Sequence, residues 1–76
     1  MDKSIPSVFG VVVRRLRLAA GLTQEELSFK AGLQRNYISS IELGEKQPSL
    51  TTIIKLSQAL GLKPGRLLDL MDDIQI

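Results

Sequence analysis

The sequence contains no cysteine and no histidine. Without cysteine, disulfide bonds and thiol chemistry are excluded. Without histidine, the chain lacks the commonest general base and the commonest metal ligand. The apolar runs are far too short to span a membrane, and the N-terminal residues contain no apolar signal-peptide core. We therefore expect a cytoplasmic protein with no cofactor, no metal and no membrane partner.

The residue types and spacings also argue against catalysis. No nucleophile lies beside a base, and no glycine-rich phosphate-binding loop is present. Asp69, Asp72 and Asp73 have spacings that place them on one helical face. Carboxylates without a calcium-loop spacing do not predict a specific metal site, so an acidic helix end is the simpler interpretation. We therefore expect that the protein is not an enzyme.

The charge is small but unevenly distributed. The net charge is +2. Residues 1–66 carry ten Lys and Arg against five Asp and Glu, whereas residues 67–76 carry three Asp and no base. The last segment should therefore lie away from any polyanion that the first part binds.

The 76 residues predict one domain, residues 1–76. So short a chain leaves much of its surface uncovered, and pairing with a second copy is a common remedy. Four glycines each follow an apolar helical pattern, as expected of helix-ending residues. These are Gly21, Gly32, Gly44 and Gly61. We expect helices at about residues 7–20, 23–32, 34–43, 49–60 and 64–73. No segment alternates as a strand does, so the predicted class is all-α, with five short helices and short connections.

Local signals set several helix ends. In "TQEE" the Thr23 hydroxyl can accept from a free backbone N–H while Glu26 reaches back, which is a capping box. Ser49 should cap the fourth helix, whereas Gln34 is a poor cap for the third. Gly10 lies inside the first helix and indicates a close approach by another segment.

Helical spacing also predicts which residues face the core. The first helix should bury Phe9, Val12, Val13, Leu16, Ala19 and Ala20. The fourth should bury Leu50, Ile53, Ile54, Ser57 and Leu60.

The third helix, within "LQRNYISSIE", has an unusual outward face. At about 100° per residue, Ile38 and Ile41 point to the core, and the only acid, Glu42, lies beside them. The opposite side consists of Asn36, Ser39, Ser40 and Leu43, with Arg35 and Tyr37 flanking. Such a face is either the solvated side of a small helix or a helix that reads DNA.

DNA reading would suit these residue types. The major groove admits one α-helix, and residues near the helix start reach base edges. Arg can bond doubly to guanine, and Asn to adenine. The preceding helix would cross the DNA backbone, where its free N–H groups and Gln24 could hold a phosphate.

The stretch "GLTQEELSFKAGLQRNYISSIELGEKQPSLTTIIKLSQALGL", preceded by "RLR", closely resembles the Cro/repressor-type (XRE-like) helix-turn-helix family. The resemblance covers about residues 9–70 and combines several motifs in one order with fixed spacings. Restriction–modification controller proteins and small phage-type repressors are most similar in pattern. The resemblance implies a compact lambda-repressor-like domain, with the helix-turn-helix at about residues 23–43. It also implies that the protein is a DNA-binding transcriptional regulator.

The resemblance also implies roles for matching positions. Gln24 takes the place of a phosphate-binding residue, Lys46 lies in a phosphate-contacting loop, and Arg17 and Glu42 match a structural ion pair. The candidate DNA-binding residues are Gln24, Gln34, Arg35, Asn36, Tyr37, Ser39, Ser40 and Lys46. The chain departs from the family at Gln34, where Ser or Thr is usual, and at Phe29 and Leu43, where polar residues are usual.

The last helix, about residues 64–73, carries more apolar residues than one inward stripe requires. Leu70, Met71, Ile74 and Ile76 either complete the chain's own core or form a homodimer seam. A two-fold dimer would engage two half-sites of a near-palindromic DNA operator. No small-molecule effector site is evident.

Two functions remain open at this point. As a sequence-specific transcription regulator, the protein would act by occupancy beside a promoter, where it would block RNA polymerase as a repressor or help to recruit it. As a protein-interaction module, such as an antitoxin or an adaptor, it would use the outward Phe29 and Leu43.

Overall fold

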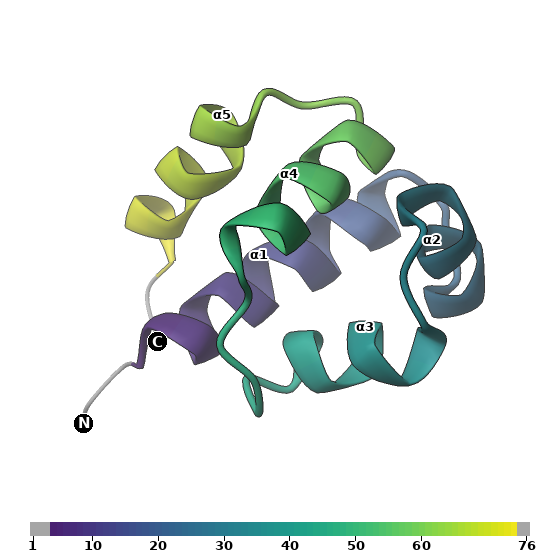
Figure 1. The fold of residues 1–76 in the computed structure, drawn as a ribbon. Coiled ribbons are helices and arrows are strands. Elements are labelled where there is room, and N and C mark those ends of the chain that lie inside the picture. Colours follow the sequence, from purple (N-terminus) through teal and green to yellow (C-terminus); the bar gives the residue numbers. More distant parts are fainter. Residues whose placement is uncertain (1–3, 75–76) are drawn as a thin grey trace.

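The computed structural model describes residues 4–74, which form five α-helices and one 3₁₀ helix, with no strand in that range (Figure 1). The elements are α1 (Ile5–Ala19), α2 (Gln24–Ala31), α3 (Arg35–Glu42), α4 (Leu50–Ala59), α5 (Pro64–Asp69) and η1 (Leu70–Asp73). The predicted all-α class is confirmed.

Side-chain caps fix where three of the helices begin. Thr23 Oγ1 accepts from the Glu26 amide at 3.0 Å, and Glu26 Oε1 accepts from the Thr23 amide at 2.9 Å, so the capping box is present. Ser49 Oγ accepts from the Thr52 amide at 3.1 Å and caps α4. Ser4 caps α1 in the same way, which is why this helix begins two residues before the predicted position.

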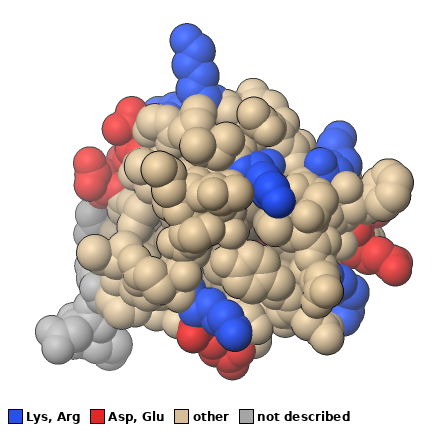
Figure 2. Space-filling view, in the orientation of Figure 1, with Lys and Arg blue, Asp and Glu red and all other residues tan. Residues whose placement is uncertain are grey.

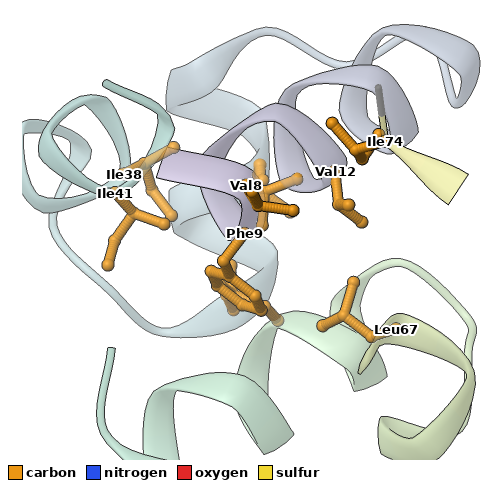
Figure 3. Packing of buried hydrophobic residues seen from close by; sticks show 11 residues of the cluster. Val8, Phe9, Val12, Ile38, Ile41, Leu67 and Ile74 are labelled. Atoms are coloured by element: carbon orange, nitrogen blue, oxygen red, sulfur yellow. The ribbon is translucent and has the colours of Figure 1, made fainter. Parts of the chain in front are cut away.

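The core lies where α1 meets α3, α4 and α5. Figure 3 shows Phe9 of α1 between Ile38 and Ile41 of α3 and Leu67 of α5, and Phe9 is 1% exposed. α3 packs on α1 and α2, α4 packs on α2 and α5, and η1 packs on α1. This arrangement fixes α3 through its apolar side and leaves its other side to solvent.

At Gly10, α1 passes close to the backbone at the end of α3. A Cβ at this position would lie 2.6 Å from the Glu42 carbonyl oxygen. The close approach predicted from the sequence is therefore confirmed, and the contact is with the backbone of α3.

Two predicted inner faces are partly wrong. Ala19 and Ala20 are exposed at the end of α1. In α4, Leu50 and Ile54 are exposed, whereas Thr52 and Leu56, which were not expected in the core, are buried. Ser57 is buried as predicted. The buried Thr52 hydroxyl is satisfied by hydrogen bonds, so this polar residue can take a core position.

The C-terminal segment also differs from the prediction. The expected helix 64–73 divides into α5 and a tighter 3₁₀ turn, η1, whose acidic residues are unfavourable at a helix C-terminus. Ile74 is only 8% exposed and belongs to the chain's own core. Leu70 and Met71 are half-buried against this core. Ile76 lies outside the described residues.

Within residues 4–74, no helix combines the length and the apolar character that crossing a membrane requires.

Candidate nucleic-acid interface

A three-residue turn, residues 32–34, joins α2 to α3. Gly32 adopts a left-handed conformation with φ 68°, which a residue with a side chain rarely adopts, and this turns the chain from α2 into α3. Two helices joined by so short a turn form a helix-turn-helix unit.

The two ends of α3 are held differently. Gln34 precedes the helix, and its side chain makes no capping hydrogen bond. At the other end, the amide of Gly44 donates to the Ile41 carbonyl at 3.0 Å and the amide of Glu45 donates to the Ser40 carbonyl at 2.9 Å. The C-terminal end is thus closed by backbone bonds, as in a Schellman motif, while the N-terminal end has no side-chain partner.

The outward face of α3, namely Arg35, Asn36, Ser39 and Ser40, carries no acid. Arg35 and Asn36 are exposed, and Ser39 and Ser40 are half-buried. The only acid of α3, Glu42, is buried on the other side. Anionic groups can therefore approach this face without meeting a carboxylate of α3.

A surface hollow of about 480 Å³ lies beside this face. Its lining comes from the turn, from α3 and from the following loop. The residues are Gly32, Leu33, Gln34, Asn36, Tyr37, Ser40 and Lys46. Five of the eight candidate DNA-binding residues are thus brought together. Arg35, Ser39 and Gln24 do not line the hollow.

Tyr37 is tied to α4. Its hydroxyl is hydrogen-bonded to the Thr52 hydroxyl at 3.0 Å, and Ser49 Oγ donates to Thr52 Oγ1 at 3.0 Å. Tyr37 is one of the candidate DNA-binding residues predicted from the sequence. In the structure that hydroxyl already has a partner. Thr52 was missed because its type, taken alone, suggests a surface position.

A buried ion pair joins α1 to α3. Arg17 Nε donates to Glu42 Oε2 at 2.6 Å, and Nη2 donates to Oε1 at 3.1 Å. Nη1 donates to the Leu22 carbonyl at 2.8 Å, so the guanidinium also holds the loop before α2. The hydrogen bond to Glu42 raises the pKa of Arg17 although burial opposes this, and the residue stays charged.

Gln24, at the start of α2, takes part in the same network. Its Nε2 donates to Glu42 Oε1 at 3.1 Å, and the side chain is half-buried. A side-chain amide has two N–H donors, so one remains for another acceptor. The ion pair therefore orients Gln24 at the junction of α1, α2 and α3.

The basic groups visible in one view of the surface are scattered (Figure 2). On the side of the molecule that Figure 2 shows, the Lys and Arg side chains are separate and form no continuous basic patch. Asp69, Asp72 and Asp73 are exposed on α5 and η1. Because the summed charge is weak, a strong interaction with a polyanion must depend on individually placed contacts.

Two large apolar side chains are exposed near this region. Leu43, at the end of α3, is 67% exposed, and Phe29, on α2, is 89% exposed. Phe29 borders a second hollow together with Leu22, Glu25, Glu26 and Lys30. Neither side chain contributes to the core.

Comparisons with known proteins agree with this geometry. Residues 13–67 match the family model described as helix-turn-helix. The control protein C.BamHI of Bacillus amyloliquefaciens is 46% identical over 70 residues, which cover 91% of this chain and 86% of that protein. The immunity repressor protein of Bacillus phage phi105 is 37% identical over 54 residues, covering 71% of this chain and 38% of that protein.

A solved structure is similar as well. The restriction-modification controller protein C.AhdI from Aeromonas hydrophila superposes with a TM-score of 0.79 at 44% identity, covering 82% of this chain and 94% of that chain. The chain therefore belongs to the XRE-type helix-turn-helix family of DNA-binding transcriptional regulators, which are not enzymes and which include restriction–modification controller proteins and phage repressors.

Proposed function

We propose that this regulator binds a near-palindromic double-stranded DNA operator as a homodimer and reads each half-site with α3 in the major groove. The observation that carries the proposal is the acid-free outward face of α3, exposed beside the hollow that Lys46 borders. A face of this shape and composition fits a groove lined with acceptors and phosphates.

The residues divide into two roles. Arg35 and Asn36 are the base readers, and each doubly bonded pair is typically worth about 1–3 kcal/mol of discrimination. Ser39 and Ser40 lie further along the same face and add contacts to bases or sugars. Gln34 and Tyr37 line the hollow beside α3, where they would lie near the DNA backbone.

Phosphate contacts position the protein without reading sequence. Lys46 supplies a charge from the loop, and Gln24 supplies the second N–H of its amide. The Arg17–Glu42 pair has a structural role, because it fixes Gln24 relative to α3.

The homodimer is supported by apolar surface on α4 and α5. Leu50 is 72% exposed, and Ile54 and Leu68 are also exposed. α4 packs on α5, so these side chains and the half-buried Leu70 and Met71 come from neighbouring elements. A two-fold seam there would present two copies of α3 to one duplex. Bound beside a promoter, the dimer would block RNA polymerase or help to recruit it.

A second function is favoured by one observation, the nearly complete exposure of Phe29. A protein-interaction module such as an antitoxin or an adaptor would use this side chain to bind a partner protein. DNA binding that is undetectable even at low salt would favour this alternative.

Repeated selection from random duplex DNA tests the proposal. We expect an enriched motif with two-fold symmetry, and a spacing of about 10 base pairs between half-site centres would place the two α3 helices in successive major grooves. Sedimentation equilibrium should show a dimer that Leu68→Asp weakens. Binding without any enriched motif, and fading with salt alone, would contradict sequence-specific reading.

A further inference from the structure

Leu43 occupies an unexpected place for an apolar residue. It is 67% exposed at the end of α3 and contributes nothing to the core. Its backbone is still helical, with φ −81° and ψ −5°, so it continues the geometry of α3.

Leu43 shares a line with two polar residues of the outward face. Asn36, Ser40 and Leu43 have i, i+4 and i+7 spacing, and residues so spaced lie above one another on a helix. A surface that lies along Asn36 and Ser40 would therefore also face Leu43.

The position of Leu43 is fixed by the backbone around it. The amides of Gly44 and Glu45 close the helix end, and a Cβ at Gly44 would lie 2.8 Å from the Cα of Ser7. The end of α3 is thus packed against the start of α1. Leu43 cannot turn inward without breaking these contacts.

We propose that Leu43 is a further specificity-determining residue, which contacts the 5-methyl group of a thymine in each half-site. The proposal rests on the proposed function, that is, on α3 lying in the major groove. A leucine offers no hydrogen bond to a phosphate or a base edge, and the thymine methyl group is the apolar feature of the major groove.

Helix geometry predicts which thymine is read. Seven residues correspond to about 10 Å along α3. Successive base pairs are about 3.4 Å apart along the DNA axis, and the groove also winds around that axis, so this length covers at most about three base-pair steps. The thymine should therefore lie within about three base pairs of the position that Asn36 reads.

The test begins with the operator selected by the full-length chain from synthetic duplexes, in which thymine is the only carrier of a 5-methyl group. Each thymine is then replaced singly by uracil, which removes the methyl group alone. One thymine per half-site, within about three base pairs of the Asn36 position, should be sensitive. We expect binding there to weaken about fourfold, the typical value of one buried apolar carbon.

Leu43→Ala should weaken binding to the thymine duplex by a similar factor. This variant should bind the thymine duplex and the uracil duplex with the same affinity. The difference between the effect of uracil on the parent and its effect on Leu43→Ala gives the interaction energy of this one contact. Leu18→Ala is the matched control, because Leu18 is an exposed leucine of α1, and it should retain the uracil effect. Leu43→Met should retain most of the uracil effect, because methionine is also a large apolar side chain.

Different results separate this inference from the proposed function. If no motif is enriched, the proposed function fails and this inference fails with it. If a motif is enriched but no thymine is sensitive to uracil at the predicted distance, only the role of Leu43 is overturned. The same holds if the uracil effect persists unchanged in Leu43→Ala.

Discussion

The Cβ of an alanine at Gly10 would lie 2.6 Å from the carbonyl oxygen of Glu42. No rotamer can relieve this overlap, because both partners are backbone or attached directly to it. Gly10→Ala should push α3 away from α1 and cost about 1–3 kcal/mol of the free energy of unfolding, typical of overpacking. Urea unfolding measures this loss.

Gly65→Ala is the control for Gly10→Ala. A Cβ at Gly65, in the first turn of α5, meets no atom within 4 Å. This substitution should be neutral or slightly stabilising, because alanine favours helix more than glycine. Equal stability of the two variants would contradict the backbone contact between α1 and α3.

Removal of one partner of the buried ion pair should be costly. Glu42→Gln leaves the Arg17 guanidinium buried without an anion, and such a loss typically costs about 3–5 kcal/mol. The double variant Arg17→Met/Glu42→Leu should recover much of the stability, because no unpaired charge remains buried. Urea unfolding of the single and double variants gives the coupling energy. A double variant no more stable than Glu42→Gln would show that the charge is not the cause.

The capping box of α2 should make stability depend on pH at the acidic end. The hydrogen bond from the Thr23 amide, followed by that involving the Thr23 side chain, lowers the pKa of Glu26 below its ordinary 4.5. The unfolded chain therefore takes up the proton first as the pH falls. The stabilisation is complete above about pH 4.5, and it is lost as the pH falls through the lowered pKa of the folded state.

Glu26→Gln separates this effect from the cap itself. Glutamine can still complete the capping box, but it does not titrate. The difference in Tm between the parent and this variant should shrink as the pH is lowered from 6 to 3, which thermal unfolding at each pH will show. Glu25→Gln, in the same turn but outside the box, is the comparison. A difference that stays constant with pH would rule out the Glu26 carboxylate as the source.

The two roles proposed for the interface should respond differently to salt. Lys46→Ala should weaken binding to every duplex and reduce the slope of log K against log salt by about 0.9 for each phosphate that the lysine no longer neutralises. Asn36→Ala should instead relax the base preference at one position and leave the slope unchanged. Lys63→Ala removes an exposed lysine at the start of α5 and should change neither quantity. An unaltered slope in Lys46→Ala would remove Lys46 from the phosphate-binding residues.

Much of the fold could be predicted because its signals are local. The capping box at Thr23 and the glycine ends depend on neighbouring residues only, and both are present in the structure. The division of α3 into a buried side with Ile38 and an exposed side with Asn36 follows from helical spacing. These features need no knowledge of the other helices.

What could not be predicted depends on contacts between distant segments. Leu50 was expected in the core but is exposed, whereas Thr52, which was not among the expected core residues, is buried. The buried Thr52 hydroxyl is hydrogen-bonded to the hydroxyl of Tyr37, which lies on another helix. In the same way, the bond from Gln24 to Glu42 requires the packing of α2 against α3, which sequence spacing does not specify.

The unequal ends of α3 have a consequence for the motion of this helix. Its last turn is closed by backbone bonds, whereas its first turn has no side-chain cap. Local opening should therefore start at the end that carries Arg35 and Asn36. Amide hydrogen exchange would be fastest there and slowest near Ile41. Arg35 and Asn36 would thus lie on the turn of α3 that adjusts most easily to the DNA groove. The closed last turn would keep the rest of the helix in place.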